Sequence, residues 1–149
     1  MTLICTNNYH DDDLLWINAD KIKAFSLAER TEILEGKSTV FSEYLASGGH
    51  FFDYTAAKKE LKYYELRVEI DGTEGFLPLA RSYNPKELAE IMHKIRVETL
   101  LNGSADVSAE TENANLAYLE EGCGIQKTLN EETNKTVKDL LEKREGVEK

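Results

Sequence analysis

Alternating apolar residues between positions 64 and 70 predict a β-strand that leads into a tight turn. Four apolar side chains stand two residues apart: Tyr64, Leu66, Val68 and Ile70. Side chains with this period lie on one face of a strand. Asp71 and Gly72 follow directly, and this dipeptide suits the central positions of a two-residue hairpin turn. We therefore expect a β-hairpin whose second strand covers residues 76–80.

The length of the turn decides which residues face each other in this hairpin. A two-residue turn places Val68 opposite Gly75, whereas a three-residue turn places Val68 opposite Phe76. Pro78 has no N–H group to donate to a neighbouring strand. The second strand is therefore expected at the edge of a sheet, or to end there.

A helix is predicted over residues 85–102. Asn84 is a favoured N-cap, Pro85 suits the first helical position and Gly103 suits the residue that closes a helix. Glu87 stands where its carboxylate can reach back to the cap. One face of the helix is apolar: Leu88, Ile91, Met92 and Ile95. The outer face carries charges of alternating sign: Lys86, Glu90, Lys94 and Glu98. This amphipathic helix is expected to pack on the sheet.

The first 25 residues read as the start of an antiparallel meander. Strands are predicted over residues 2–5, 14–17 and 21–25, the last two being separate strands or one bent strand broken at residues 18–20. Polar residues 7–13 are typical of a turn or loop.

Residues 26–62 give a mixed pattern that leaves alternatives open. Residues 26–36 fit a short helix or a long hairpin, whereas residues 38–41 are typical of a strand. Residues 54–62 have a helical composition, with three lysines close together.

The chain after Gly103 is predicted to be a linker followed by a C-terminal helical segment. Small, polar and acidic residues fill positions 104–113, which is typical of a linker. A short helix over 115–120 is expected to break at residues 122–124, and the last helix to run from 128 to 145. Thr128 and Glu131 have the spacing of a capping box. The predicted fold is therefore α+β, with an α+β domain over 1–103 and a helical extension over 104–149.

The last helix offers few apolar residues: Val137, Leu140 and Leu141. So small a patch is too little for the core face of a monomer. We therefore expect this helix to dock on a neighbouring molecule, and the protein to form a homo-oligomer.

Composition narrows the classes of function. The 149 residues carry a net charge of −10, which argues against the general phosphate affinity of a DNA-binding domain. No apolar run approaches the length of a membrane span, and residues 1–6 lack the features of a signal peptide. A cytoplasmic protein is expected. Cys5 and Cys123 are interpreted as free, buried or half-buried thiols, the alternatives being a disulfide or a reactive thiol.

Catalytic and metal-binding motifs are not evident. The cluster from His10 to Asp13 is expected to be a hydrated loop, because neighbouring side chains of an extended segment point to opposite sides and cannot easily converge on one ion. His50 follows two glycines and is the one candidate for a general base, yet no nucleophile can be paired with it. Neither glycine-rich phosphate motif is present. We predict no enzyme activity, no metal and no cofactor.

An anion-binding site is the main functional candidate. The start of the helix after Asn84 presents free amide groups and the positive end of the helix dipole. Arg81 and Tyr83 precede it, and Arg67 is expected on an adjacent strand. Together these four residues are predicted to hold a phosphate, a nucleotide or a partner carboxylate. The alternative is that Asn84 only caps the helix and Arg81 is only solvated.

The order of elements resembles small bacterial and phage proteins built from a sheet and a helix. The resemblance rests on residues 16–25, the hairpin residues 69–72 and the helix start at 84–88. The families it resembles are the flagellar FlbD-like proteins and the phage anti-Thoeris proteins, which sequester cyclic ADP-ribose signals. It covers residues 14–25 and 63–97, and the chain departs from the shorter pattern after Gly103.

Three functions follow, in order of preference. The first is a non-enzymatic, phage-encoded binding protein of the host cytosol that assembles as a homo-oligomer and sequesters a small anionic nucleotide. The second is an acidic inhibitor that binds a bacterial immune protein directly, as anti-CRISPR proteins do. The third is a hydrolase that uses His50.

Overall fold

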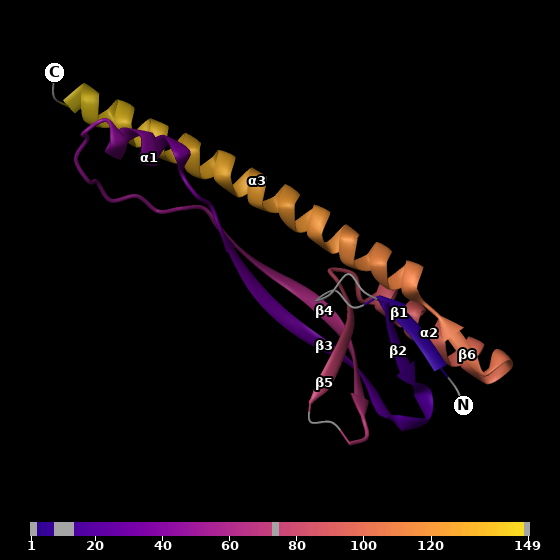
Figure 1. The fold of residues 1–149 in the computed structure, drawn as a ribbon. Helices are drawn as coiled ribbons and strands as arrows, with labels where there is room; N and C mark the ends of the chain where they lie inside the picture. Colours follow the sequence, from indigo (N-terminus) through magenta and orange to yellow (C-terminus); the bar gives the residue numbers. More distant parts are fainter. Residues whose placement is uncertain (1–2, 8–13, 73–74, 148–149) are drawn as a thin grey trace. The chain divides into compact units, whose positions relative to one another are not determined.

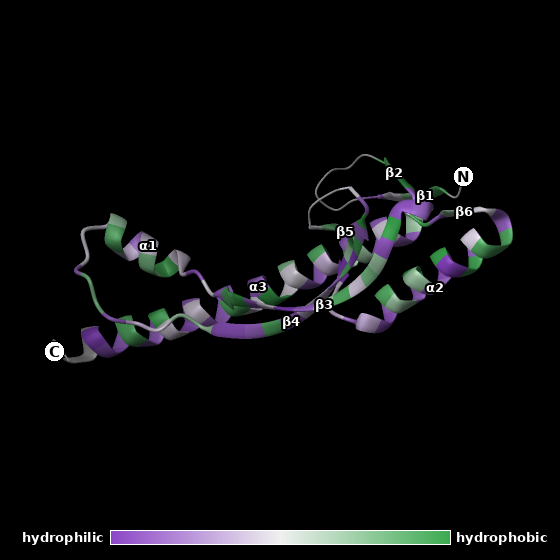
Figure 2. Cartoon of the chain, turned by 90° about the horizontal axis from the view of Figure 1, so that it is seen from below, coloured by the Kyte–Doolittle hydropathy of each residue, from purple (hydrophilic) through white to green (hydrophobic). Residues whose placement is uncertain are grey.

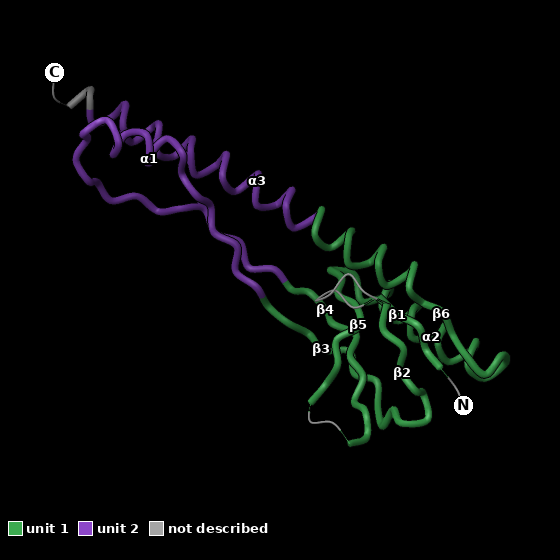
Figure 3. Tube along the Cα trace, viewed as in Figure 1, with its two compact units in different colours: residues 1–31, 62–120 green, residues 32–61, 121–149 purple. Residues whose placement is uncertain are grey.

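The computed structural model describes residues 3–7, 14–72 and 75–147 (Figure 1). These residues fold as α+β, with two three-stranded sheets and three α-helices, which confirms the predicted class. The chain divides into two compact units (Figure 3): residues 1–31 with 62–120 form unit 1, and residues 32–61 with 121–149 form unit 2. Each unit combines two separate stretches of chain, unlike the predicted division at residue 103.

The first sheet of unit 1 contains strands from both stretches of chain that form this unit. Strand β1 (Leu3–Asn7) pairs antiparallel with β2 (Leu14–Asn18) and parallel with β6 (Ser104–Asp106). A 3-10 turn (Ala19–Lys21), capped by the Asn18 side chain, separates β2 from the next strand. Residues 14–25 therefore hold two separate strands. The predicted meander is confirmed only for β1 and β2, because the next strand belongs to the other sheet. The linker prediction for residues 104–113 is wrong, because β6 lies in it.

The second sheet has the strand order β3-β4-β5. Its strands are β3 (Ile22–Glu35), β4 (Lys58–Ile70) and β5 (Phe76–Ser82). The edge position predicted for β5 is confirmed. Residues 26–35 form neither a short helix nor a hairpin of their own, because they belong to the single strand β3. The helix predicted over 54–62 is wrong, because β4 already begins at Lys58. Its lysines are exposed on the strand, where Lys62 pairs with Glu29 of β3 at 3.2 Å.

Both predicted registers of the β4–β5 hairpin are wrong. Val68 faces Leu77, two residues beyond its partner in the two-residue-turn register, and the register shifts at a bulge between Leu66 and Arg67. The connection from Asp71 to Gly75 is longer than either turn, and Gly72 and Gly75 both have positive φ, at 86° and 84°. Next to the turn the shift is two residues, so the same faces of the strands coincide there. Beyond the bulge it is three residues: Leu66 faces Ala80 instead of the predicted Leu77.

Helix α2 (Pro85–Asn102) is confirmed together with its caps. The Asn84 side chain accepts a hydrogen bond from the Lys86 amide, and Gly103 closes the helix in the left-handed conformation at φ 75°. Leu88, Ile91 and Ile95 are buried. They belong to the core of unit 1, which also contains these residues of the two sheets and of helix α3: Ile4, Ile17, Leu66, Val68, Leu79, Ala80, Val107 and Ala114.

Unit 2 contains helix α1 (Thr39–Ala46). The strand predicted over residues 38–41 is wrong, because Ser38 caps this helix by accepting a hydrogen bond from the Phe41 amide at 2.9 Å. The Phe41 ring contacts three aromatic rings in this unit: Phe51, Phe52 and Tyr54. Tyr44 contacts Phe52 and extends the cluster. These rings supply much of the apolar surface of a small unit.

Helix α3 (Ser108–Val147) is one helix of 40 residues. The break predicted at residues 122–124 and the helix start predicted at 128 are wrong: the Thr128 hydroxyl donates to the Gly124 carbonyl at 3.1 Å, as it does inside a helix. Figure 2 shows hydrophilic and hydrophobic residues intermixed along the helix. Val137 is fully buried, so the patch that was expected to need a second molecule is covered in part within unit 2.

Candidate binding surfaces

Asn84 has a structural role at the start of α2. Its side-chain oxygen accepts from the Lys86 amide at 3.0 Å. The Ser82 hydroxyl accepts from the Asn84 amide at 3.0 Å and donates to the Glu87 carboxylate at 2.8 Å. Glu87 therefore reaches the cap through Ser82, and its negative charge occupies the positive end of the helix. An incoming anion would meet this carboxylate.

Arg81 and Tyr83 gather around Tyr118 of α3, within unit 1. The Arg81 guanidinium lies 4.3 Å from the centre of the Tyr118 ring. The Tyr83 ring stacks on Tyr118 with a centroid distance of 4.7 Å and an interplanar angle of 20°, and Tyr63 lies at 5.4 Å. Asn115 accepts the Arg81 amide at 3.0 Å. Tyr118 is buried, so this cluster forms part of the packing between β5 and α3.

Arg67 lies apart from that cluster but on the same face of the sheet. Leu66 and Val68 point into the core, so Arg67 points to the opposite face. Glu65 shares this face and stands opposite Arg81 on β5. The Arg67 guanidinium lies 4.5 Å from the centre of the Phe76 ring, and its Nη2 donates to the Ser26 hydroxyl at 3.4 Å. Its Nε is buried without a hydrogen-bond partner among the described residues.

The structure thus places two of the four predicted residues together, Arg81 and Tyr83, and gives each of the four intramolecular contacts. Sequence reasoning missed Tyr118 and Tyr63. The binding role of the four residues stays a prediction.

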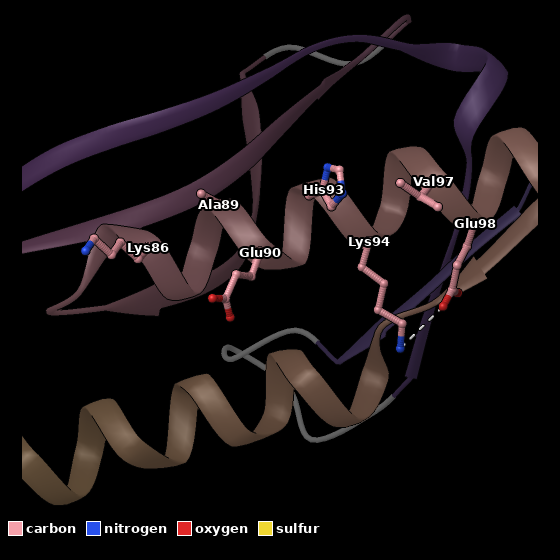
Figure 4. Close-up of a pocket in the computed structure, with 7 residues that line it drawn as sticks. All are labelled: Lys86, Ala89, Glu90, His93, Lys94, Val97 and Glu98. Atoms are coloured by element: carbon pink, nitrogen blue, oxygen red, sulfur yellow. Dashed lines mark ion pairs between the residues drawn. The ribbon is translucent and has the colours of Figure 1, made fainter.

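The outer face of α2 carries an open groove of about 600 Å³, here named the α2 groove (Figure 4). Its lining comes from one helix: Lys86, Ala89, Glu90, His93, Lys94, Val97 and Glu98. Of the alternating charges predicted for this face, Lys86 and Glu90 are exposed, whereas Lys94 and Glu98 are half-buried. Beyond the groove, Leu100 and Leu101 are 86% and 74% exposed, and this end of α2 is hydrophobic in Figure 2.

A second cavity of about 520 Å³ lies between α2 and α3 in unit 1. Lys94 lines both this cavity and the α2 groove. Its ammonium group donates a hydrogen bond to Glu110 of α3 and pairs with Glu98 at 3.6 Å. The bond to Glu110 raises the pKa of Lys94 above its ordinary value, against the opposing effect of burial. Lys94 therefore remains charged and fixes one edge of the α2 groove.

The remaining chemical candidates are the cluster from His10 to Asp13, His50 and the two cysteines. The cluster from His10 to Asp13 lies outside the described residues. His50 is exposed in unit 2. No three metal-ligand side chains come together in the part of the chain that the structure describes. Both cysteines are free; Cys5 is buried as expected, and burial followed by the Asp106 charge raises the pKa of its thiol. Cys123 is exposed, so the expected partial burial of this thiol is wrong.

Comparisons with known proteins give no relative. No family model, curated protein or solved structure matches the chain. The resemblance to FlbD-like and anti-Thoeris proteins therefore stays a prediction. Within the described residues, no helix combines the length and apolar character needed to cross a bilayer.

Proposed function

We propose that the chain is a non-enzymatic binding protein that binds a helical segment of a protein partner in the α2 groove. The observation that carries this proposal is a pair of rows of side chains along α2, each with a spacing of four residues and each exposed except at Lys94 and Glu98, which are half-buried. One row is mainly apolar: Ala89, His93, Val97 and Leu101. The other alternates in charge: Lys86, Glu90, Lys94 and Glu98.

Rows with this spacing are the ridges through which one helix packs against another. The apolar row supplies the area that binding removes from water. The charged row contains two cations and two anions, so it attracts neither an anion nor a cation strongly as a whole. A helix with an apolar stripe beside alternating charges matches both rows.

This proposal keeps from the second function expected from the sequence the direct binding of a protein, and it leaves the identity of that protein open. It is favoured over a nucleotide at the start of α2 because the Glu87 carboxylate already lies there.

A designed peptide pair tests the proposal. The first peptide is an amphipathic helix whose charged row reads Lys, Glu, Lys, Glu, so that it meets opposite charges when antiparallel to α2. The control has the same composition in the order Lys, Lys, Glu, Glu and meets like charges at two positions in either direction. We expect the first to bind with a Kd between roughly 1 μM and 1 mM, or about 4–8 kcal/mol, by fluorescence anisotropy.

The variant Val97→Asp places a charge in the apolar row and is expected to abolish this binding. Val97 is partly exposed, so the substitution leaves the core of unit 1 intact. Equal affinity of both peptides, or binding that survives Val97→Asp, would refute recognition in the α2 groove.

Arg67 supports a second candidate, sequestration of a small anionic nucleotide. Its buried Nε has no acceptor among the described residues, and a phosphate oxygen satisfies such a donor. Native mass spectrometry with a panel of linear and cyclic nucleotides tests this candidate. A retained, unmodified nucleotide that is lost in Arg67→Ala supports it, whereas retention by neither protein rejects it.

A further inference from the structure

We infer that the helix bound in the α2 groove is α2 of a second copy of this chain, so that the groove is the interface of an antiparallel homodimer. The inference rests on the proposed function and names its partner. It follows from the order in which charges and side-chain sizes occur along the charged row and the apolar row of α2.

The charged row is complementary in charge to the same row read in the opposite direction, as it is in an antiparallel pair. Read from the N-terminus it is Lys86, Glu90, Lys94 and Glu98. In an antiparallel pair Lys86 stands opposite Glu98 of the other copy, and Glu90 opposite Lys94. Two-fold symmetry repeats both contacts, so all four positions meet an opposite charge. A parallel pair in register would place like charges together.

The apolar row is also complementary to the same row read in the opposite direction, here in the size of its side chains. Antiparallel alignment places Ala89 opposite Leu101 of the second copy and His93 opposite Val97. The smallest side chain of the row thus meets the largest, which is how facing helices fill the space between them. Leu101 is 74% exposed, and this pairing removes it from water.

Intrahelical pairing is the competing explanation for the alternating charges. Opposite charges four residues apart stabilise an isolated helix, and Lys94 and Glu98 form such a pair at 3.6 Å. Lys94 also donates a hydrogen bond to Glu110 of α3, so a second copy's Glu90 would share this ammonium group. The two explanations make opposite predictions for one double variant. Lys86→Glu with Glu98→Lys gives the order Glu, Glu, Lys, Lys, which places like charges four apart within the helix but remains complementary to its own reverse.

The experiment measures the dimer dissociation constant by sedimentation equilibrium of the full chain at low salt, where exposed charges are screened least. Lys86→Glu alone creates two like-charge contacts per dimer and is expected to weaken the dimer about tenfold, from contacts worth up to about 1 kcal/mol each. The double variant is expected to return within about threefold of the original affinity. Mixed with the original chain, it is expected to form few mixed dimers.

Both substitutions agree with the helix dipole, since they add an acid near the start of α2 and a base near its end, so circular dichroism should show an intact fold in each variant. A double variant weaker than Lys86→Glu assigns the alternation to intrahelical pairs and overturns the inference. Dimerisation that neither variant changes also overturns it. A chain that stays monomeric yet binds the designed peptide overturns self-pairing and leaves the proposed function standing.

Discussion

Replacement of Gly36 by alanine is the sharpest test of packing in unit 2. A Cβ at Gly36 would lie 2.0 Å from the Thr133 hydroxyl and 2.5 Å from the Leu129 carbonyl oxygen of α3. The second contact is with helix backbone, which cannot rotate away. The Thr133 hydroxyl also accepts the Ala57 amide at 3.0 Å, and the Gly36 amide donates to the Ala57 carbonyl at 2.7 Å. Gly36→Ala therefore disturbs three packed segments at once.

The expected loss combines two terms. Overpacking a filled site costs about 1–3 kcal/mol, and a displaced hydrogen bond about 0.5–1.5 kcal/mol, so we expect a total of roughly 2–4 kcal/mol. For a chain of this length the midpoint of thermal unfolding should fall by about 5–15 °C. Amide exchange measured by mass spectrometry should rise in residues 32–61 and 121–144.

Gly124→Ala is the matched control, because nothing lies within 4 Å of a Cβ at Gly124. Glycine inside a helix is less favourable than alanine by about 1 kcal/mol, so this variant should be slightly stabilised. Gly36→Ala with unchanged unfolding and unchanged exchange in unit 2 would refute the close approach of Gly36 to α3.

Three further predictions concern unit 1. Asn84→Ala should cost about 1 kcal/mol in urea unfolding through loss of the α2 cap, whereas Asn84→Gly should cost only a few tenths; equal losses would contradict the cap. Hydrogen bonds from the hydroxyl and amide of Ser108 lower the pKa of Asp106 from 3.8, so Asp106 contributes stability above that pH that is lost as the pH falls through its lowered pKa. Ser108→Ala should raise the pKa measured by NMR titration of the Asp106 carboxyl, and an unmoved pKa would rule out the hydroxyl as its main cause. Asn115→Ala removes the acceptor of the Arg81 amide and should cost about 1–3 kcal/mol, while exposed Asn113→Ala should cost almost nothing; similar losses would argue against the Asn115 bond.

Helix α2 could be predicted because its signals are local. Asn84, Pro85 and Gly103 act on the backbone beside them, and the apolar spacing of Leu88, Ile91 and Ile95 needs only one buried side. The same holds for the alternation in β4. In both elements, the residues that determine the backbone conformation lie in the element itself or directly beside it.

The register of the β4–β5 hairpin could not be predicted because it depends on contacts across the strands. Asp71-Gly72 suits a two-residue turn, but the shifted register places Val68 opposite Leu77 rather than Gly75. A large apolar pair of this kind contributes more than a pair with glycine. Beyond the bulge the register changes by one residue, and the neighbours Leu79 and Ala80 are both buried.

The candidate site illustrates the same limit. Arg81 and Tyr83 are conspicuous in an acidic sequence, but nothing near them indicates Tyr118, 37 residues beyond Arg81. Tyr118 fills the space beside both side chains. The outer face of α2 could be predicted from its own spacing, and it is there that the proposed interface lies.

The continuity of helix α3 could not be predicted because polar residues interrupt the apolar residues on its buried face. Side chains on this face accept backbone amides from elsewhere in the same unit: Thr111 from Asn7, Asn115 from Arg81, Asn130 from Lys37, Thr133 from Ala57 and Asn134 from Thr39. Thr111 and Thr133 are fully buried. A search for apolar spacing passes over such residues and finds only a weak patch near the C-terminus. Because unpaired amides are costly to bury, these acceptors stabilise the segments beside α3. A polar row of this kind can hold a helix in place as firmly as an apolar stripe, provided each acceptor finds its amide.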